Sequence, residues 1–135
     1  MHHPDLSDQD YETLAAFRHA LRRFAAFSES EAKARGLTPQ QHQVLLAIKG
    51  TPGRPALSVG EIAAHLLVRH NSAVELIDRL ADAGLVMRAP DPQDRRRMLV
   101  TLTGQAEHLL VALSAAHLRE LRAIRPALLS LLRRL

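Results

Sequence analysis

The chain has 135 residues, of which 47% are apolar and 3% aromatic, with no cysteine and no tryptophan. This composition excludes a disordered chain, disulfides and cysteine-ligated zinc, and it argues against nucleic-acid binding by base stacking. The 18 Lys and Arg residues exceed the 14 Asp and Glu residues, and the resulting net charge of +4 permits a polyanionic partner without proving one.

We expect neither a signal peptide nor a membrane span. The first ten residues, MHHPDLSDQD, are acidic and polar, and the longest weakly polar run, HLLVALSAAHL, is too short to cross a bilayer. The sequence therefore predicts a cytoplasmic protein without a membrane partner. Its length fits a single domain over residues 1–135.

Two helices are predicted in the first third of the chain. Ser7 and Asp10 resemble a helix start, and apolar residues at spacings of three and four then continue to about residue 35, where Gly36 ends the pattern. The run LTPQQHQVLLAI predicts a second helix. In that run Thr38 is a cap and Gln41 completes a capping box.

The middle of the chain predicts two shorter helices joined by a turn. Residues 49–57, KGTPGRPAL, hold two glycines and two prolines and predict a loop. Ser58 and Glu61 form another capping box, which opens a third helix ending near residues 65–67. The connection LVRHN leads to a fourth helix, SAVELIDRLADAG, which Gly84 ends.

A hairpin and two more helices are predicted to follow. Residues 85–88 and 97–102 are strand-like and are separated by a charged turn. Thr103 caps a fifth helix that runs to about Ile124, and Pro126 begins a short last helix. This order predicts a mainly α fold with a small β-hairpin wing, which is the winged helix-turn-helix arrangement.

The fourth helix has an apolar side and a polar side. On a helical wheel Ala73, Leu76, Ile77 and Leu80 cluster together, and the polar side and first turn carry types that suit base edges and phosphates. Asparagine pairs with adenine, arginine with guanine or phosphate, and glutamate with the cytosine amine. The candidate DNA contacts are Arg69, His70, Asn71, Ser72 and Glu75. Taken alone, the helix favours the alternative, an ordinary solvated face.

The turn DPQDRRR carries the second candidate DNA contact. We expect Arg96 to enter a minor groove, Asp94 to hold its guanidinium in a bidentate pair, and Arg95 and Arg97 to reach phosphates. The alternative is a soluble turn with a charge cluster. The position of the cluster, directly after a helix-turn-helix, favours the DNA interpretation.

These segments carry a resemblance to a known family. The run GLVMRAPDPQDRRRMLVTLT resembles the wing signature of the MarR family of winged-helix regulators. RHNSAVELIDRLADAGLV is similar to that family's recognition helix, and LTPQQHQVLLAI resembles its second helix. Three positions depart from the family pattern: Leu67 and Ala106 stand where glycine is frequent, and Gln93 replaces a common arginine.

The resemblance implies a regulator of transcription that binds double-stranded DNA. It places a DNA-binding lobe over about residues 37–103 and dimerisation helices over about residues 7–36 and 104–135. It also implies a homodimer on a palindromic promoter site, and we expect a repressor. In addition, the run HLLVALSAAHLRELRAIRPALLSLLRRL holds more leucine than a one-sided surface helix needs, which itself favours a dimer.

Members of the family respond to small aromatic or anionic effectors, which bind between the dimer arm and the DNA-binding lobe. The corresponding candidate residues are Phe17, Arg18, Leu21, His42, Leu45, Leu46 and His108. The alternative for each apolar member is an ordinary place in the core. We expect no cofactor.

Three further functions were considered. A metal-responsive regulator would use His42 and His108, but no third ligand is evident, and His2 and His3 are taken as incidental. An enzyme is not expected because no catalytic motif is found. A winged-helix module that binds another protein remains the alternative, and a steep salt dependence of DNA binding separates it from a DNA regulator.

Overall fold

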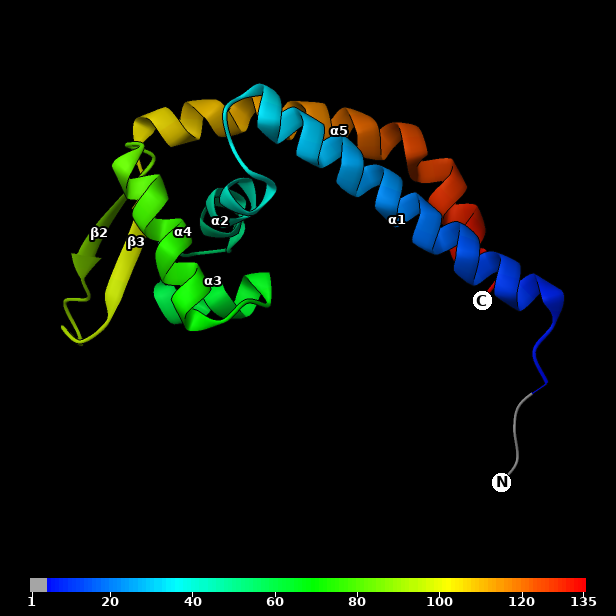
Figure 1. The fold of residues 1–135 in the computed structure, drawn as a ribbon, viewed down its shortest axis with the longest axis horizontal. Coiled ribbons are helices and arrows are strands. Elements are labelled where there is room, and N and C mark those ends of the chain that lie inside the picture. The colour runs from blue at the N-terminus through cyan, green and yellow to red at the C-terminus, as the bar shows by residue number, and fades with distance from the viewer. Residues whose placement is uncertain (1–4) are drawn as a thin grey trace.

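The computed structural model describes residues 5–135, so His2 and His3 lie outside the described residues. Figure 1 shows the elements in chain order. They are α1 (Asp8–Ala34), α2 (Pro39–Gly50), β1 (Ala56–Ser58), α3 (Val59–Leu66), α4 (His70–Asp82), β2 (Val86–Pro90), β3 (Met98–Leu102) and α5 (Gly104–Arg133). The predicted mainly helical fold with a small hairpin wing is confirmed.

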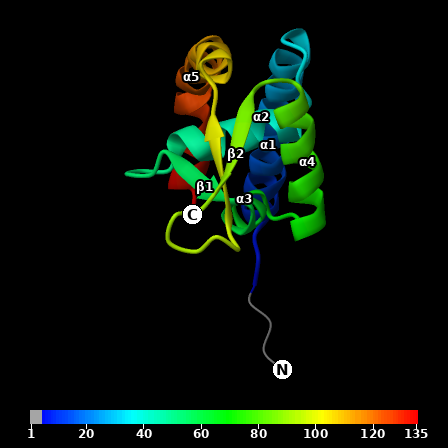
Figure 2. The ribbon, with the colours of Figure 1, turned by 90° about the vertical axis from the view of Figure 1, so that its left-hand side faces the viewer.

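The two long helices form an arm, and the remaining elements form a lobe at one end of it. In Figure 1, α1 and α5 lie side by side and run in opposite directions, while the first half of α5 extends over the lobe. The strands form one antiparallel sheet in the order β1-β3-β2. Both views show the loop between β2 and β3 and the N-terminal end of α4 on the same side of the lobe (Figures 1 and 2).

The helix ends follow the local signals in the sequence. The Ser58 hydroxyl accepts a hydrogen bond from the Glu61 amide at 3.1 Å, and the Glu61 carboxylate accepts one from the Ser58 amide at 2.9 Å. The predicted side-chain caps are found at Ser7, Thr38, Ser58 and Thr103. Gly36 and Gly84 end α1 and α4 with φ of +78° and +75°, a conformation that side chains with a Cβ disfavour.

The core of the lobe lies around α2 and is closed by the first half of α5. Val44, Leu45 and Ile48 are fully buried there, and they pack with apolar residues of α3, α4, β3 and α5. The predicted inner face of α4 is confirmed, since its four apolar residues are all buried. Burial of one such side chain contributes about 1.5–3 kcal/mol, so this face fixes which side of α4 meets solvent.

The prediction of a loop over residues 49–57 was wrong at both ends. Helix α2 continues to Gly50, and Ala56–Ser58 form the edge strand β1, in which Leu57 lies opposite Val100 of β3. A three-residue strand is too short to show a hydrophobic period. Its pairing with β3 links segments more than forty residues apart, so no local pattern could predict it.

The predicted break before Pro126 was also wrong. One continuous α5 runs through this residue to Arg133. Proline removes one helix hydrogen bond and crowds the carbonyl four residues earlier, which bends a helix when flanking contacts hold both halves. Figure 1 shows α5 turning downwards in its C-terminal part while it stays beside α1.

The turn between α3 and α4 is shorter than predicted. Helix α4 begins at His70, so only residues 67–69 connect the two helices. Leu67 adopts the left-handed conformation, with φ of 57° and ψ of 42°, and its side chain is 92% exposed. A leucine here costs about 1–2 kcal/mol relative to a right-handed position, a penalty that glycine avoids.

We therefore expect Leu67→Gly to stabilise the protein by about 1 kcal/mol, which raises Tm by roughly 3–6 °C for a chain of this size. Leu67→Ala is the matched control, because it removes the exposed side chain and keeps a Cβ in the left-handed region. Thermal unfolding followed by circular dichroism measures both. A Leu67→Gly variant no more stable than Leu67→Ala would contradict the assignment of strain to this turn.

Candidate nucleic-acid interface

The N-terminal end of α4 is open to solvent. Arg69 is the N-cap, and its side chain makes no capping hydrogen bond, in contrast to the capped ends of the other helices. The amide groups of the first turn are therefore free to bind a phosphate. The predicted contacts His70, Asn71, Ser72 and Glu75 are all exposed around this end.

One acidic residue on the outer side of α4 is neutralised by the sheet. The carboxylate of Asp78 is paired with the guanidinium of Arg88 from β2. An unpaired carboxylate at this place would repel a DNA phosphate, and the ion pair reduces that repulsion. The pair also ties α4 to the first strand of the wing.

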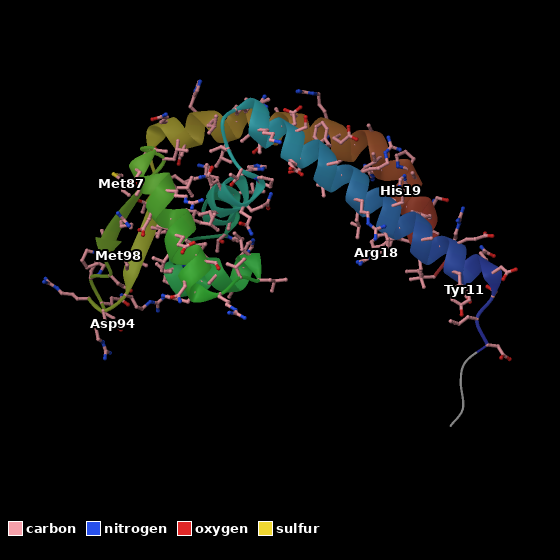
Figure 3. All side chains as sticks on the ribbon, viewed as in Figure 1. Tyr11, Arg18, His19, Met87, Asp94 and Met98 are labelled. Carbon is pink, nitrogen blue, oxygen red and sulfur yellow. The ribbon has the colours of Figure 1, made fainter. Side chains whose placement is uncertain are left out.

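The two aspartates of the wing loop determine its shape. Asp91 Oδ1 accepts a hydrogen bond from the Gln93 amide at 2.9 Å, and Asp94 Oδ1 accepts one from the Arg96 amide at 3.1 Å. Side chains that accept from the backbone two residues later stabilise tight turns without help from the core. Figure 3 shows Asp94 at the tip of this loop, beyond Met98 of β3.

The predicted contact between Asp94 and Arg96 is present in a different geometry. Arg96 Nε lies 3.2 Å from Asp94 Oδ1, so the contact is made through one nitrogen and one oxygen rather than the bidentate pair that was predicted. The Arg96 side chain is 92% exposed. The guanidinium therefore keeps most of its donors available to a partner outside the lobe.

Arg97 is engaged within the protein. Its Nη2 lies 3.1 Å from Glu61 Oε1, and the same carboxylate is paired with both terminal nitrogens of Arg54 from the loop before β1. The Ser58 amide first, and then Arg54, lower the pKa of Glu61 to about 2. Sequence reasoning missed Arg54 and assigned Glu61 only to a cap, because Arg97 is 36 residues away and Arg54, although 7 residues away, lies in an irregular loop with no helical spacing to Glu61.

A hollow lies between the wing and the N-terminal ends of α3 and α4. Its volume is about 340 Å³. It is lined by Ser58, Val59, Gly60, His70, Arg96, Arg97 and Met98. Three residues that were predicted from separate motifs, His70, Arg96 and Arg97, therefore border one concave surface.

The predicted effector residues come from the arm and from the lobe, and no hollow found among residues 5–135 is lined by all of them. His42 and Leu45 are buried, Phe17 is half-buried, and Arg18, Leu21 and Leu46 are exposed. Figure 3 shows Arg18 on the underside of α1, the side of the lobe. His108 is exposed and lines a different hollow of about 320 Å³ between the C-terminal end of α1 and the start of α5.

His42 lies against His117, and not against His108 as the metal hypothesis assumed. The two ring centres are 4.9 Å apart, and Phe24 and Phe27 of α1 pack edge-on against the His117 ring. His117 Nδ1 lies 2.7 Å from the Leu113 carbonyl, which only accepts, so this nitrogen carries a proton. In neutral His117, Nε2 therefore accepts from the Ser28 hydroxyl at 2.8 Å.

His42 has no comparable partners. Its side chain is 1% exposed, and Nδ1 makes no hydrogen bond within the described residues. Burial first, and the neighbouring His117 second, lower the pKa of His42. Over residues 5–135 no group of three or more His, Asp or Glu side chains is arranged to hold a metal ion, and no helix there is long and apolar enough to span a membrane.

Comparison with known proteins identifies the family. The MarR family model matches residues 35–97, which begin directly after α1 and cover α2, the helix-turn-helix and the wing loop. The chain belongs to the MarR family. Its winged lobe and two-helix arm have the fold of a MarR family regulator of known structure.

Relatives agree with this assignment. BadR of Rhodopseudomonas palustris, a transcriptional activatory protein, is 37% identical over 87 residues, which are 64% of this chain and 50% of BadR. The chain thus spans about half the length of this curated relative. AbsC of Streptomyces coelicolor, a MarR family regulator, has the same fold, with a TM-score of 0.76 and 19% identity over 90% of this chain and 81% of AbsC.

A third neighbour is BpsR of Bordetella bronchiseptica, whose DNA binding is regulated by 6-hydroxynicotinic acid. It is 26% identical, with a TM-score of 0.66, over 91% of this chain and 97% of BpsR. The relatives of this MarR-type chain are regulators rather than enzymes.

The buried His42 makes the stability of this MarR-type chain depend on pH. Because its folded pKa is lowered, the unfolded chain binds a proton more readily once the pH falls below the ordinary histidine value of about 6.5. We expect the free energy of unfolding to fall between about pH 7 and about pH 5.5, by no more than about 1.3 kcal/mol, the limit that the ordinary histidine pKa sets, and His42→Leu to remove that part of the loss.

Urea unfolding at several pH values measures this difference. His108→Leu is the matched control, because His108 is exposed and its removal leaves the dependence in place. An unchanged pH dependence in His42→Leu would show that His42 does not couple protonation to folding.

Proposed function

We propose that this chain is a homodimeric regulator that binds a palindromic promoter site in double-stranded DNA. The observation that carries the proposal is the placement of two predicted DNA contacts on one side of the lobe. The open N-terminal end of α4 and the wing tip share that side, and one hollow runs between them. Such a surface fits a major groove and the neighbouring minor groove.

In this arrangement α4 reads the major groove. Asn71 pairs with an adenine, Arg69 contacts a guanine or a phosphate, and Glu75 accepts from a cytosine amine. His70 and Ser72 line the same end, where the free amide groups of the first turn bind a phosphate. The ion pair of Asp78 with Arg88 reduces the acidic charge that the helix would otherwise present to DNA.

The wing contacts the minor groove and the adjacent backbone. Arg96 is the residue that enters the groove, because its side chain is almost fully exposed at the loop tip and, among residues 5–135, is held only through Nε, by Asp94. Arg95 is exposed beside it and reaches a phosphate. Arg97 is half-exposed, so it can approach a phosphate while Glu61 holds one of its nitrogens.

A second copy of the chain covers the arm in this proposal. Leucines of α5 line a shallow hollow of about 340 Å³ on its outer side, and several of them are exposed. They are Leu118, Leu121, Leu129 and Leu132. An apolar strip of this kind on a long helix needs a partner, and a two-fold dimer would space two α4 helices about 34 Å apart on DNA.

We further propose that the regulator acts in the cytoplasm as a repressor by occluding a promoter, and that a small aromatic acid releases it. BpsR, whose DNA binding is regulated by 6-hydroxynicotinic acid, supports this ligand class. Arg18, on the underside of α1, supplies a cation for the carboxylate on the side of the arm that faces the lobe. An effector bound there would bias the spacing of the two lobes.

DNA binding is tested by titrating the protein against duplex DNA from the promoter region beside its own gene at several salt concentrations. We expect specific binding that weakens steeply with salt. Arg96→Ala should weaken it roughly 5- to 30-fold, the loss of about 1–2 kcal/mol typical of one groove-reading arginine. Fluorescence anisotropy measures the affinities.

Lys33→Ala is the matched control for charge. Lys33 is exposed near the C-terminal end of α1, which lies on the opposite side of the molecule from the wing tip (Figure 1), so this variant should bind as the wild type does. Equal affinities of Arg96→Ala and Lys33→Ala would contradict the wing assignment. Absence of salt-sensitive binding by the wild type would favour a protein-interaction module. Addition of 6-hydroxynicotinic acid to the complex tests the effector class.

The dimer is tested with Leu121→Asp. Leu121 is 40% exposed in the single chain, so a charge there costs the monomer little but would be buried in the proposed interface. We expect the wild type to have twice the mass of one chain in sedimentation equilibrium, and the variant to dissociate. Leu67→Asp, which places the same charge on the lobe, should remain dimeric. A monomeric wild type would refute this part of the proposal.

A further inference from the structure

Glu61 lies where three separate segments of the lobe meet. It is at the third position of α3, its side chain is 32% exposed, and the two arginines paired with it come from the loop before β1 and from the end of the wing loop. Chain connectivity does not hold the wing loop beside α3, because Arg97 is 36 residues from Glu61 along the chain. One carboxylate therefore connects the helix-turn-helix to the wing.

The carboxylate of Glu61 is almost fully used by these contacts. Oε1 accepts from the Ser58 amide at 2.9 Å, from Arg54 Nη2 at 3.0 Å and from Arg97 Nη2 at 3.1 Å. Oε2 faces Arg54 Nη1. Only the first of these contacts belongs to the capping box. The three contacts to the two arginines go beyond what the helix end requires.

The negative charge is what allows the two arginines to converge. Two guanidinium groups that share one oxygen repel each other, and a neutral acceptor would not offset that repulsion. A capping box, in contrast, works with glutamine as well as with glutamate, because only a side-chain carbonyl oxygen is needed. Capping α3 and binding Arg54 and Arg97, which we call the arginine anchor, are therefore two separable roles of the Glu61 side chain.

The anchor reaches the wing tip through the backbone of Arg97. The Arg97 amide donates to the Asp94 carbonyl at 2.9 Å, and the Arg97 carbonyl accepts from the Asp91 amide at 2.9 Å. Asp94 in turn holds Arg96 through its Oδ1 atom. Fixing the Arg97 side chain on α3 therefore limits the motion of the whole loop that presents Arg96.

We propose that Glu61 is a positioning residue that holds the wing against α3 by pairing Arg97 and Arg54, and that it thereby sets the place of Arg96 relative to α4. This inference rests on the proposed DNA-binding function for its consequence, while the anchor itself is a property of the free protein. In this role Glu61 acts on DNA recognition through arginines and needs no contact with a base.

The first test is Glu61→Gln, which keeps the capping acceptor and removes the charge. In the full-length protein without DNA, we expect the amides of Asp91 and Arg97 to exchange hydrogen roughly 2- to 5-fold faster relative to core amides, because each exposed pair contributes up to about 1 kcal/mol. Ser58→Ala is the matched control. It weakens the cap and leaves the carboxylate, so relative wing exchange should not change.

The second test uses DNA binding. Glu61→Gln should lower the ratio of specific to non-specific affinity for DNA about threefold or more. It should have no such effect in the Arg97→Ala variant, because the effects of substituting two residues that act as one unit are not additive. If Glu61→Gln only destabilised the fold, it would lower the affinity for DNA equally in the wild type and in the variant with Arg97→Ala. If the amides of Asp91 and Arg97 exchange hydrogen at the same rate in Glu61→Gln as in the wild type, the proposal is overturned.

The two measurements separate this inference from the proposed function. If the wild type binds no DNA, the exchange experiment still reads the anchor in the free protein. If the wing loosens while specific binding is unchanged in the Glu61→Gln variant, the anchor exists but does not position Arg96 for recognition, and that part of the proposal falls.

Discussion

The packing of the apolar face of α4 onto the core around α2 is the constraint on which the rest of the structure depends. Once Leu76, Ile77 and Leu80 are buried, the opposite face of the helix has to meet solvent. The sheet and the first half of α5 close the same core, so they hold the wing and the arm at fixed places around it. The polar first turn of α4 and the wing tip face one side as a result of this burial.

Paired charges then organise the surface that burial has oriented. Carboxylates of this lobe are held by arginines: Asp78 by Arg88, Asp94 by Arg96, and Glu61 by two arginines at once. Exposed pairs of this kind add little to stability, typically less than about 1 kcal/mol each. Their effect is instead geometric, because they set the place of flexible side chains that would otherwise lose entropy when they bind DNA.

The junction of the arm and the lobe has a different chemistry. His42 and His117 lie in contact among aromatic rings of α1, and His42 is buried with an unpaired nitrogen. Such a site favours the neutral form of His42 and leaves the joint sensitive to acid. The arm carries the proposed dimer surface and the lobe carries the proposed DNA surface. The packing at this junction therefore affects the position of one surface relative to the other.

The sequence by itself determined the capped helix starts, the buried face of α4, the presence of the wing and the family resemblance. Each of these rests on residues close together in the chain, such as the capping pair of Ser58 and Glu61 or the aspartates that turn the wing loop. Only the tertiary structure decided the strand β1, the unbroken α5, the partner of His42 and the arginine anchor on Glu61. The strand pairing, the contact of His42 with His117 and the pair of Arg97 with Glu61 join segments far apart in the chain, and no local period or spacing records which distant residue will lie opposite.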